Sequence, residues 1–495
     1  MPEPPPLSRI VNLARTGAIT QAWAMFTDTG LADVIDDPKI LTLKGRLLKD
    51  QARQASGPMR ARLFLEAAQA YADAARIRPD SYPLINAAAM SLFAGQQDHM
   101  RFLAREVLGL LDGGGGVGET PYWHEATRAE ALLLLGDMEG AQAALAAAVA
   151  NAPDAWEDRA TTIRQFREIA EALGLSVDWL ASLAPPPTLV FSGIMGIGSA
   201  DGSAQQGIEA AVQQSGVGSA YGALAAGADI LVAEAVLRAG AALNIVLPAA
   251  PEAFRRQSVE PFGADWSSRF DAMMDQAESV TVVAGCNSVT DGSIKLAALV
   301  AQGMAMDKAQ RMQSRCTSIS ITDERRDGAA ADNIIVNVDR SVQDGVSTEV
   351  PPSKMAMLIA GVDRQLFARY DLAEMAILHG MHVAASFDIE HAATVLARLI
   401  ESRSTGPLAA NAIVAENAHD ISDVEIARTV RIAQSTTQGT IGAIMEAAMV
   451  LKAFYPEAGI EPLGELPDQG RASQIYALRN MLRASRTIAG GNRFV

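Results

Sequence analysis

Small polar residues and one aspartate follow predicted strands in the middle of this chain, where they could bind a ligand. A short apolar run over 188–191 ends in a serine and a glycine, and a second glycine-rich segment follows. The candidate ligand-binding residues are Ser192, Gly193, Ser219, Gly222, Gly227 and Asp229. Glycines at the carboxyl ends of strands let backbone N–H groups and helix amino termini approach phosphate. The pattern therefore indicates a site for a phosphate-bearing small molecule.

Two further charged residues are candidates with two interpretations each. Glu234 shares a predicted helix face with apolar residues, where a carboxylate is costly unless it is paired or faces a cleft. It could act on a ribose or a glycosidic bond, or it could be a helix-end glutamate held by a nearby arginine. Arg256 could bind phosphate, or it could be a solvated surface charge.

The elements around these residues alternate between strands and helices. Strands are predicted at 188–191, 243–248 and 279–284, a helix at 205–214, and a loop that carries Ser219 and Gly222 before a second helix. Such alternation is typical of a parallel sheet with helices on both faces.

The order of these motifs over 189–323 resembles the SLOG superfamily, Rossmann-like sensors of nucleotide ligands related to the DNA-processing protein DprA and the cytokinin-activating LOG enzymes. The resemblance lies in Ser219-x-x-Gly222-x-x-x-x-Gly227-x-Asp229, the helix after it and a strand ending in Leu247-Pro248. It implies an α/β Rossmann-like domain over 186–340 that binds a nucleotide-derived ligand. The Pro-Gly-Gly-x-Gly-Thr signature of LOG hydrolases is absent, which favours binding over hydrolysis.

Residues 1–183 have a helical pattern throughout. Alanine and leucine recur at spacings of three and four, and three stretches, beginning near 41, 82 and 122, are similar to one another. The helix ends near Pro79 and Pro153 look like those of tetratricopeptide units. We therefore expect an all-α helical-repeat domain that binds a protein partner; an ordinary alanine-rich bundle is the alternative.

A third domain is predicted at 351–482, after the polar stretch 322–348, with a tail at 483–495. Strands at 354–362, 379–387 and 408–414 and helices at 389–401 and 425–433 precede a return strand from 438 and closing segments at 462–466 and 473–478. This order resembles a class III adenylate/guanylate cyclase domain, which implies an α+β ferredoxin-like fold.

The resemblance also implies that the cyclase metal site is lost. The positions of the two metal-binding aspartates fall on Gly361 and Met381, and that of the transition-state asparagine falls on Ala427. Glycine and methionine cannot bind Mg²⁺, which prefers oxygen ligands; a register error could bring Asp363 to the first position. Arg431 matches the arginine of the family. The chain is thus expected to contain a pseudocyclase that forms a homodimer or pairs with an active class III cyclase.

Composition limits the other possibilities. The chain has 495 residues, 49% of them hydrophobic, and a net charge of -16, which argues against nucleic acid or an anionic membrane as the main partner. Two cysteines make no disulfide framework, and we see no signal peptide or membrane-spanning run, so a cytoplasmic location is expected. His379 and His382 lie three apart in a predicted strand, on opposite faces, and no metal site is predicted.

Two functions remain open. The first is a non-catalytic signalling protein that binds a nucleotide-derived ligand in the middle domain and protein partners elsewhere, with no certain cofactor and no catalytic residue. The alternative is a nucleotide-processing enzyme, an N-glycosidase or phosphoribosyl-type hydrolase, in which Glu234 is the acid or nucleophile.

Overall fold

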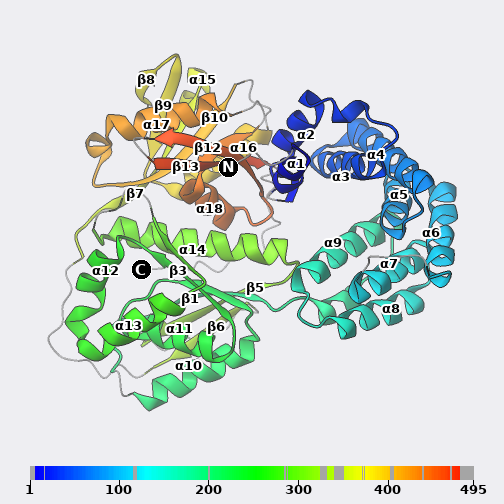
Figure 1. The fold of residues 1–495 in the computed structure, drawn as a ribbon. Helices are drawn as coiled ribbons and strands as arrows, with labels where there is room; N and C mark the ends of the chain where they lie inside the picture. Colours follow the sequence, from blue (N-terminus) through cyan, green and yellow to red (C-terminus); the bar gives the residue numbers. More distant parts are fainter. Residues whose placement is uncertain are drawn as a thin grey trace. The chain divides into compact units, whose positions relative to one another are not determined.

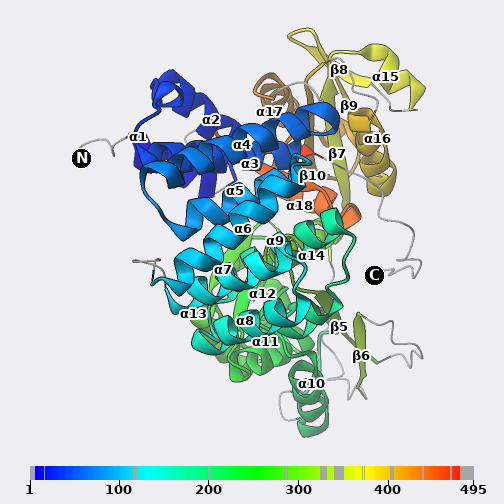
Figure 2. The same ribbon diagram turned by 90° about the vertical axis from the view of Figure 1, so that its right-hand side faces the viewer.

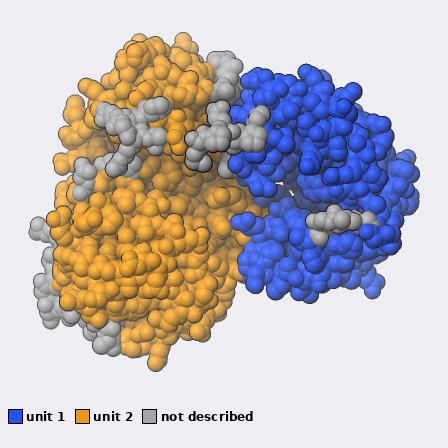
Figure 3. All heavy atoms as spheres, in the orientation of Figure 1, with its two compact units in different colours: residues 1–185 blue, residues 186–495 orange. Residues whose placement is uncertain are grey.

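The computed structural model divides into two compact units, residues 1–185 (unit 1) and 186–495 (unit 2) (Figure 3). It describes residues 6–15, 17–114, 120–198, 201–283, 286, 288–323, 332–338, 350–370, 372, 374–401, 406–436, 440–468 and 471–479. The tail predicted at 483–495 lies outside this part of the chain.

Unit 1 consists of helices that pack against one another in chain order (Figures 1 and 2). They are α1 (Pro6–Arg15), α2 (Ile19–Asp28), α3 (Pro38–Gln54), α4 (Gly57–Ile77), α5 (Ser81–Phe93), α6 (Gln97–Asp112), α7 (Pro121–Leu134), α8 (Met138–Asn151) and α9 (Trp156–Leu173), with short 3-10 helices at Leu31–Asp33 and Asp178–Leu183. Side-chain oxygens of Asp37, Asp80 and Thr120 accept N–H bonds at three helix starts. The helical character predicted for this part of the chain is confirmed.

Unit 2 begins with a six-stranded parallel sheet in the order β4-β3-β2-β1-β5-β6. Its strands are β1 (Thr188–Ser192), β2 (Ser219–Gly222), β3 (Ala242–Leu247), β4 (Ser279–Val282), β5 (Cys316–Thr322) and β6 (Asn333–Asn337). The connecting helices are α10 (Gly202–Ser215), α11 (Ala228–Arg238), α12 (Pro251–Ser258), α13 (Ala264–Gln276) and α14 (Asp291–Arg311). A parallel sheet needs such crossover helices, as the alternating pattern predicts.

Helices cover both faces of this sheet because its strands are apolar on both sides. Leu189 and Phe191 point to the face where α11 and α10 pack. Val190 and Tyr221 point to the opposite face, which α14 covers. In Figure 1, α14 accordingly lies on the other side of the strands from α11 and α13.

A second, mixed sheet has the order β12-β13-β11-β10-β7-β9-β8, in which β10 and β11 are parallel and the other neighbours are antiparallel. Its strands are β7 (Lys354–Gly361), β8 (Glu374–Leu378), β9 (Met381–Ser386), β10 (Leu408–Ala415), β11 (Ile441–Ile444), β12 (Gly459–Asp468) and β13 (Arg471–Arg479). Helices α15 (Arg364–Arg369), α16 (Ile389–Glu401), α17 (Asp423–Gln434) and α18 (Met445–Phe454) connect them.

Helix α14 joins the two sheets of unit 2. It packs on β1, β2 and β3 of the first sheet and on β7, β10 and α18 of the second. The contact with α18 is unusually close, because a Cβ built at Gly303 would lie 2.0 Å from the carbonyl oxygen of Met449. Only glycine fits at that point of α14 without moving the backbone of α18.

Two expectations from the sequence are wrong. Ser219 and Gly222 lie in the buried strand β2 and not in a loop, because the backbone of this segment pairs with β1 on one side and with β3 on the other. His379 lies outside strand β9, in the turn between β8 and β9, with a positive φ of 51°.

The close packing of α14 makes a stability prediction. Gly303→Ala should destabilise unit 2 by about 2–3 kcal/mol, the usual cost of overpacking a core. Gly207→Ala is the matched control, because Gly207 is exposed on helix α10 and a Cβ at this position would be 3.5 Å from Val336. That control should be neutral or gain up to about 1 kcal/mol. Denaturant unfolding followed by circular dichroism measures both, and equal stabilities would contradict the prediction.

Candidate ligand cavity

The main candidate site is a cavity of about 480 Å³ at the carboxyl ends of β1, β2 and β3. Its walls come from these strand ends, from the first turn of α11, from α12 and from one side of α14, and Met355 of β7 also lines it. Most of the lining is apolar, with Phe191, Val246 and Phe254 among the contributors. A concave, mostly apolar site of this size, at the carboxyl edge of a parallel sheet, suits a small organic ligand.

Four of the sequence-predicted residues line this cavity: Ser192, Gly193, Gly222 and Asp229. The other four are not among the described residues that line it. Ser219 lies at the opposite end of β2, Gly227 precedes α11, Glu234 lies two turns into α11, and Arg256 is exposed on α12. The structure thus brings together half of the predicted set.

Asp229 is the one carboxylate among the described lining residues. Its side chain is 7% exposed, and its Oδ2 accepts the N–H of Ala225 at 3.2 Å. The Oδ1 atom is buried with no hydrogen-bond partner. Burial raises the pKa of this carboxyl to about 7, although the backbone N–H groups of Ala225 and Gly193 act in the opposite direction. A ligand that donates a hydrogen bond to Oδ1 would satisfy this group.

The glycines that border the cavity are required by packing. A Cβ at Gly193 would lie 2.2 Å from the Cβ of Ala228, and one at Gly222 would lie 2.5 Å from the ring of Phe191. Gly227 has φ +115°, and a Cβ there would lie 2.9 Å from the carbonyl oxygen of Ile194. These glycines allow α11 and the loop after β1 to pack closely against each other, next to the cavity.

Glu234 is engaged in a bidentate ion pair. Nε and Nη2 of Arg269 each donate to one of its carboxylate oxygens at 2.6 Å, and a second arginine, Arg238, lies 3.7 Å away. The guanidinium of Arg269 also stacks on Trp266 of α13, with its centre 4.4 Å from the ring. The arrangement ties α11 to α13, as the interpretation of a glutamate held by an arginine expects.

Sequence reasoning missed the polar residues that other helices bring to the cavity. Gln257 and Ser258 come from α12, and Lys295 and Gln302 come from α14. Lys295 and Gln302 lie seven residues apart on one face of α14. No signal pointed to α14, since its strand partners are distant in the sequence.

In the second sheet, the two positions that the cyclase resemblance aligns with metal-binding aspartates are Gly361 and Met381. Gly361 ends β7 and Met381 begins β9, where it is buried. A Cβ at Gly361 would lie 3.0 Å from Leu408 and 3.6 Å from Phe367, so apolar side chains surround this position. Within the described residues, no group of three or more His, Cys, Asp or Glu side chains is placed to hold a metal ion.

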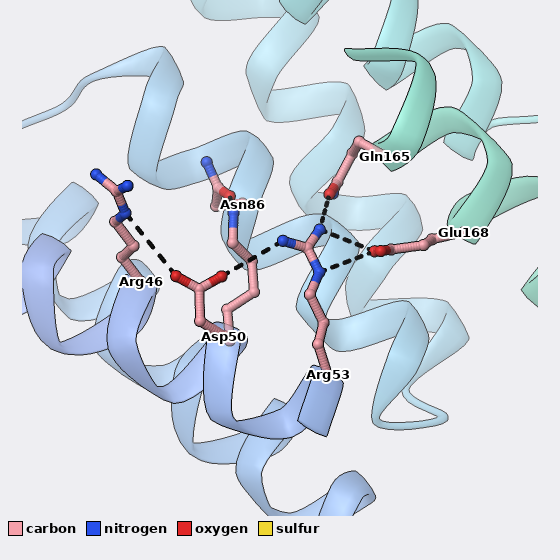
Figure 4. A network of polar contacts seen from close by, with 7 residues as sticks. Arg46, Asp50, Arg53, Asn86, Gln165 and Glu168 are labelled. Atoms are coloured by element: carbon pink, nitrogen blue, oxygen red, sulfur yellow. Dashed lines mark hydrogen bonds and ion pairs between the residues drawn. The ribbon is translucent and has the colours of Figure 1, made fainter. Parts of the chain in front are cut away.

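Unit 1 contains a polar network between its helices (Figure 4). Arg53 of α3 donates to Glu168 of α9 at 2.8 Å and to Gln165 at 3.0 Å. Lys49, one turn earlier on α3, donates to Asn86 of α5 at 2.9 Å. Helices that are more than a hundred residues apart in sequence are therefore linked by ion pairs in addition to apolar packing.

Glu130 of α7 joins this network by accepting the side-chain N–H of Gln165 at 3.2 Å. Burial raises the pKa of Glu130 from 4.5 to about 7, and burial lowers the pKa of Lys49 from 10.5 to about 8. Both shifts mean that the charged forms are less stable here than in water.

The comparisons with known proteins bear on unit 1. The family model of the Tetratricopeptide Repeats-Sensor (TPR-S) matches residues 8–91, which span α1 to α5. A search of curated proteins finds no match. Among solved structures, a point mutant of the Thermobaculum terrenum O-GlcNAc transferase is 13% identical with a TM-score of 0.21, over 61% of this chain and 57% of that one. The match to TPR-S supports tetratricopeptide-like repeats and so a role in protein interaction or sensing.

We find no helix among the described residues with the length and apolar character that crossing a bilayer requires.

The shifted Glu130 predicts a pH dependence of stability. Because its pKa is higher in the folded state, its contribution is present below pH 4.5 and is lost as the pH rises through 7. The pKa of Lys49 is lowered, so its contribution to stability is present at high pH and is lost as the pH falls through 8. Between pH 5 and 7 the contribution of Lys49 to stability is therefore constant. Glu130→Gln, which keeps an acceptor for Gln165, should therefore gain stability over the wild type as the pH rises from 5 to 7.5.

Thermal unfolding across this pH range measures the effect. Glu66→Gln is the matched control, because it makes the same charge change at an exposed pair with Arg62 on α4. A stability difference between Glu130→Gln and the wild type that does not grow with pH would overturn the prediction.

Proposed function

We propose that this chain is a non-catalytic signalling protein that binds a nucleotide-derived ligand in the cavity of unit 2 and protein partners through the helical repeats of unit 1. The observation that carries the proposal is the cavity itself, which Asp229 lines, together with the buried and unpartnered state of the Oδ1 atom of this residue. Six parallel strands with helices on both faces support a Rossmann-like domain, and ligands of such sheets bind at the carboxyl edge, where this cavity lies.

The proposal extends to the second sheet. The first four strands of this sheet along the chain, β7, β8, β9 and β10, lie side by side as β10-β7-β9-β8, which supports a ferredoxin-like, cyclase-related fold. Leu408 and Phe367 are the side chains nearest Gly361, and no group of three or more His, Cys, Asp or Glu side chains is placed to hold Mg²⁺ among the described residues. We therefore assign this part to dimerisation, with a second copy or with a cyclase that carries both aspartates.

The alternative, a nucleotide hydrolase using Glu234, receives less support. The carboxylate of Glu234 is occupied by Arg269 and is not among the described residues that line the cavity. A general acid or nucleophile must reach the substrate directly or through one water.

Ligand binding is tested by calorimetry on the full chain with ATP, GTP, NAD, ADP-ribose and cyclic nucleotides, with and without Mg²⁺. We expect one of them to bind independently of Mg²⁺ and without turnover. Arg256→Ala, an exposed change on α12 away from the cavity lining, should leave that affinity unchanged. Binding that requires Mg²⁺ would contradict the metal-free assignment, turnover of the bound nucleotide would favour the hydrolase, and binding of none of them would refute the sensor.

The dimerisation role proposed for the second sheet is tested separately. The chain is co-expressed with a class III cyclase that carries both metal-binding aspartates. We expect co-purification and a changed cyclase activity, or a homodimer when the chain is expressed alone. A monomer that neither co-purifies with the cyclase nor alters its activity would refute the dimerisation role.

A further inference from the structure

The carboxylate of Asp229 lies where a phosphate would be expected. Asp229 is the second residue of α11, the helix that follows β2, and the amino terminus of such a helix attracts anions. Here Oδ2 of Asp229 already accepts the N–H of Ala225, just before that helix. An anionic ligand would therefore meet the protein's own carboxylate at this end of the cavity.

The Oδ1 atom of Asp229 lacks a hydrogen-bond donor. Oδ1 of Asp229 is buried and lacks a hydrogen-bond partner, and a buried acceptor without one costs free energy. The surrounding wall is mostly apolar, with Phe191, Val246 and Phe254. A flat apolar ring that carries an N–H group matches both features, whereas a phosphate, which has only acceptors when fully ionised, matches neither.

The cavity lining also includes a cationic side chain. Among the described lining residues, Lys295 of α14 is the one basic side chain, and it is exposed. The other charged residues of α11 and α12, namely Glu234, Arg238, Glu252, Arg255 and Arg256, are not among the described lining residues. Asp229 and Lys295 thus offer a ligand two different kinds of group, a buried acceptor and an exposed cation.

We propose that Asp229 recognises the amino group of a nucleobase held inside the cavity, and that any phosphate of the ligand is bound at the Lys295 end. This inference rests on the proposed function, because it specifies which part of the bound nucleotide Asp229 recognises. A volume of about 480 Å³ lies within the range of about 300–1,000 Å³ typical of sites for small organic ligands.

Pairs of nucleosides that differ in an exocyclic amino group test the proposal. Guanosine against inosine removes the 2-amino group alone, whereas adenosine against inosine and cytidine against uridine replace an amino by an oxo group and turn the neighbouring ring acceptor into an N–H donor. All are titrated calorimetrically into the full chain. A hydrogen bond to a charged group predicts that at least one amino nucleoside binds about 10-fold or more tightly than its oxo partner. In Asp229→Ala this ratio should fall to about one.

Lys295→Ala is the matched control from the same cavity. The Lys295→Ala variant should keep the ratio of affinities between the paired nucleosides. It should reduce only the increase in affinity that a 5′-phosphate gives over the nucleoside. Circular dichroism and thermal unfolding establish that both variants fold, and Asp229→Asn, which keeps an acceptor without a charge, provides a second variant of similar shape.

The pH profile gives an independent readout. Burial raises the pKa of Asp229 to about 7, and an N–H donor favours the ionised form. Nucleoside binding should therefore strengthen between pH 6 and 8 in the wild type and stay flat in Asp229→Asn. A phosphate at this position would show the opposite slope.

The outcomes separate this inference from the proposed function. Equal affinity for amino and oxo nucleosides, or a ratio that survives in Asp229→Ala, would overturn the inference and leave the sensor intact. Inorganic phosphate or ribose 5-phosphate that binds more tightly in Asp229→Ala would also overturn it. If no nucleotide, nucleoside or phosphate binds, the sensor function fails with it.

Discussion

The packing of α14 between two sheets is the constraint on which unit 2 depends. Leu296, Val300 and Ala305 of this helix belong to the apolar cluster that includes the second sheet. Close approach requires small residues, and at Gly303 the backbone of α18 leaves no space for a Cβ. Because α14 packs on both sheets, small and apolar residues such as Ala297 and Ala301 form much of the part that faces the cavity. The polar contribution of α14 to the site is therefore restricted to residues such as Lys295 and Gln302.

The ability to predict this fold from the sequence depended on how local each signal was. Strands β1 and β3 were found because parallel strands buried on both faces read as continuous apolar runs. Helix α14 was not foreseen, because a helix buried on several sides lacks the one-sided pattern that identifies amphipathic helices. The sequence of strand β2, Ser-Ala-Tyr-Gly, resembles a loop because it has no β-branched residue, and only pairing with β1 and β3 makes it a strand.

The candidate site was predictable in part for the same reason. Asp229 could be found because the glycine-rich spacing before α11 marks a helix start at the carboxyl edge of the sheet. The role of Gly193 and Gly222 could not, since the residues that forbid a side chain there, Ala228 and Phe191, come from other elements. The partner of Glu234 likewise lies 35 residues away on α13, a pairing that no local pattern encodes.

Hydrogen bonding differs between Asp229 and two other charged residues of unit 2, Glu234 and Lys452. Glu234 has both oxygens bonded to Arg269, and the fully buried Lys452 donates to Ala458 and to Gln310. For these groups, hydrogen bonds within the folded chain offset the free-energy cost of removing a charge from water. For Asp229, which lines the cavity, this holds only in part, since its Oδ1 is buried without a hydrogen-bond partner. A sequence selected for stability alone would replace it by an apolar residue, so its presence is best explained by an interaction that the isolated chain does not supply.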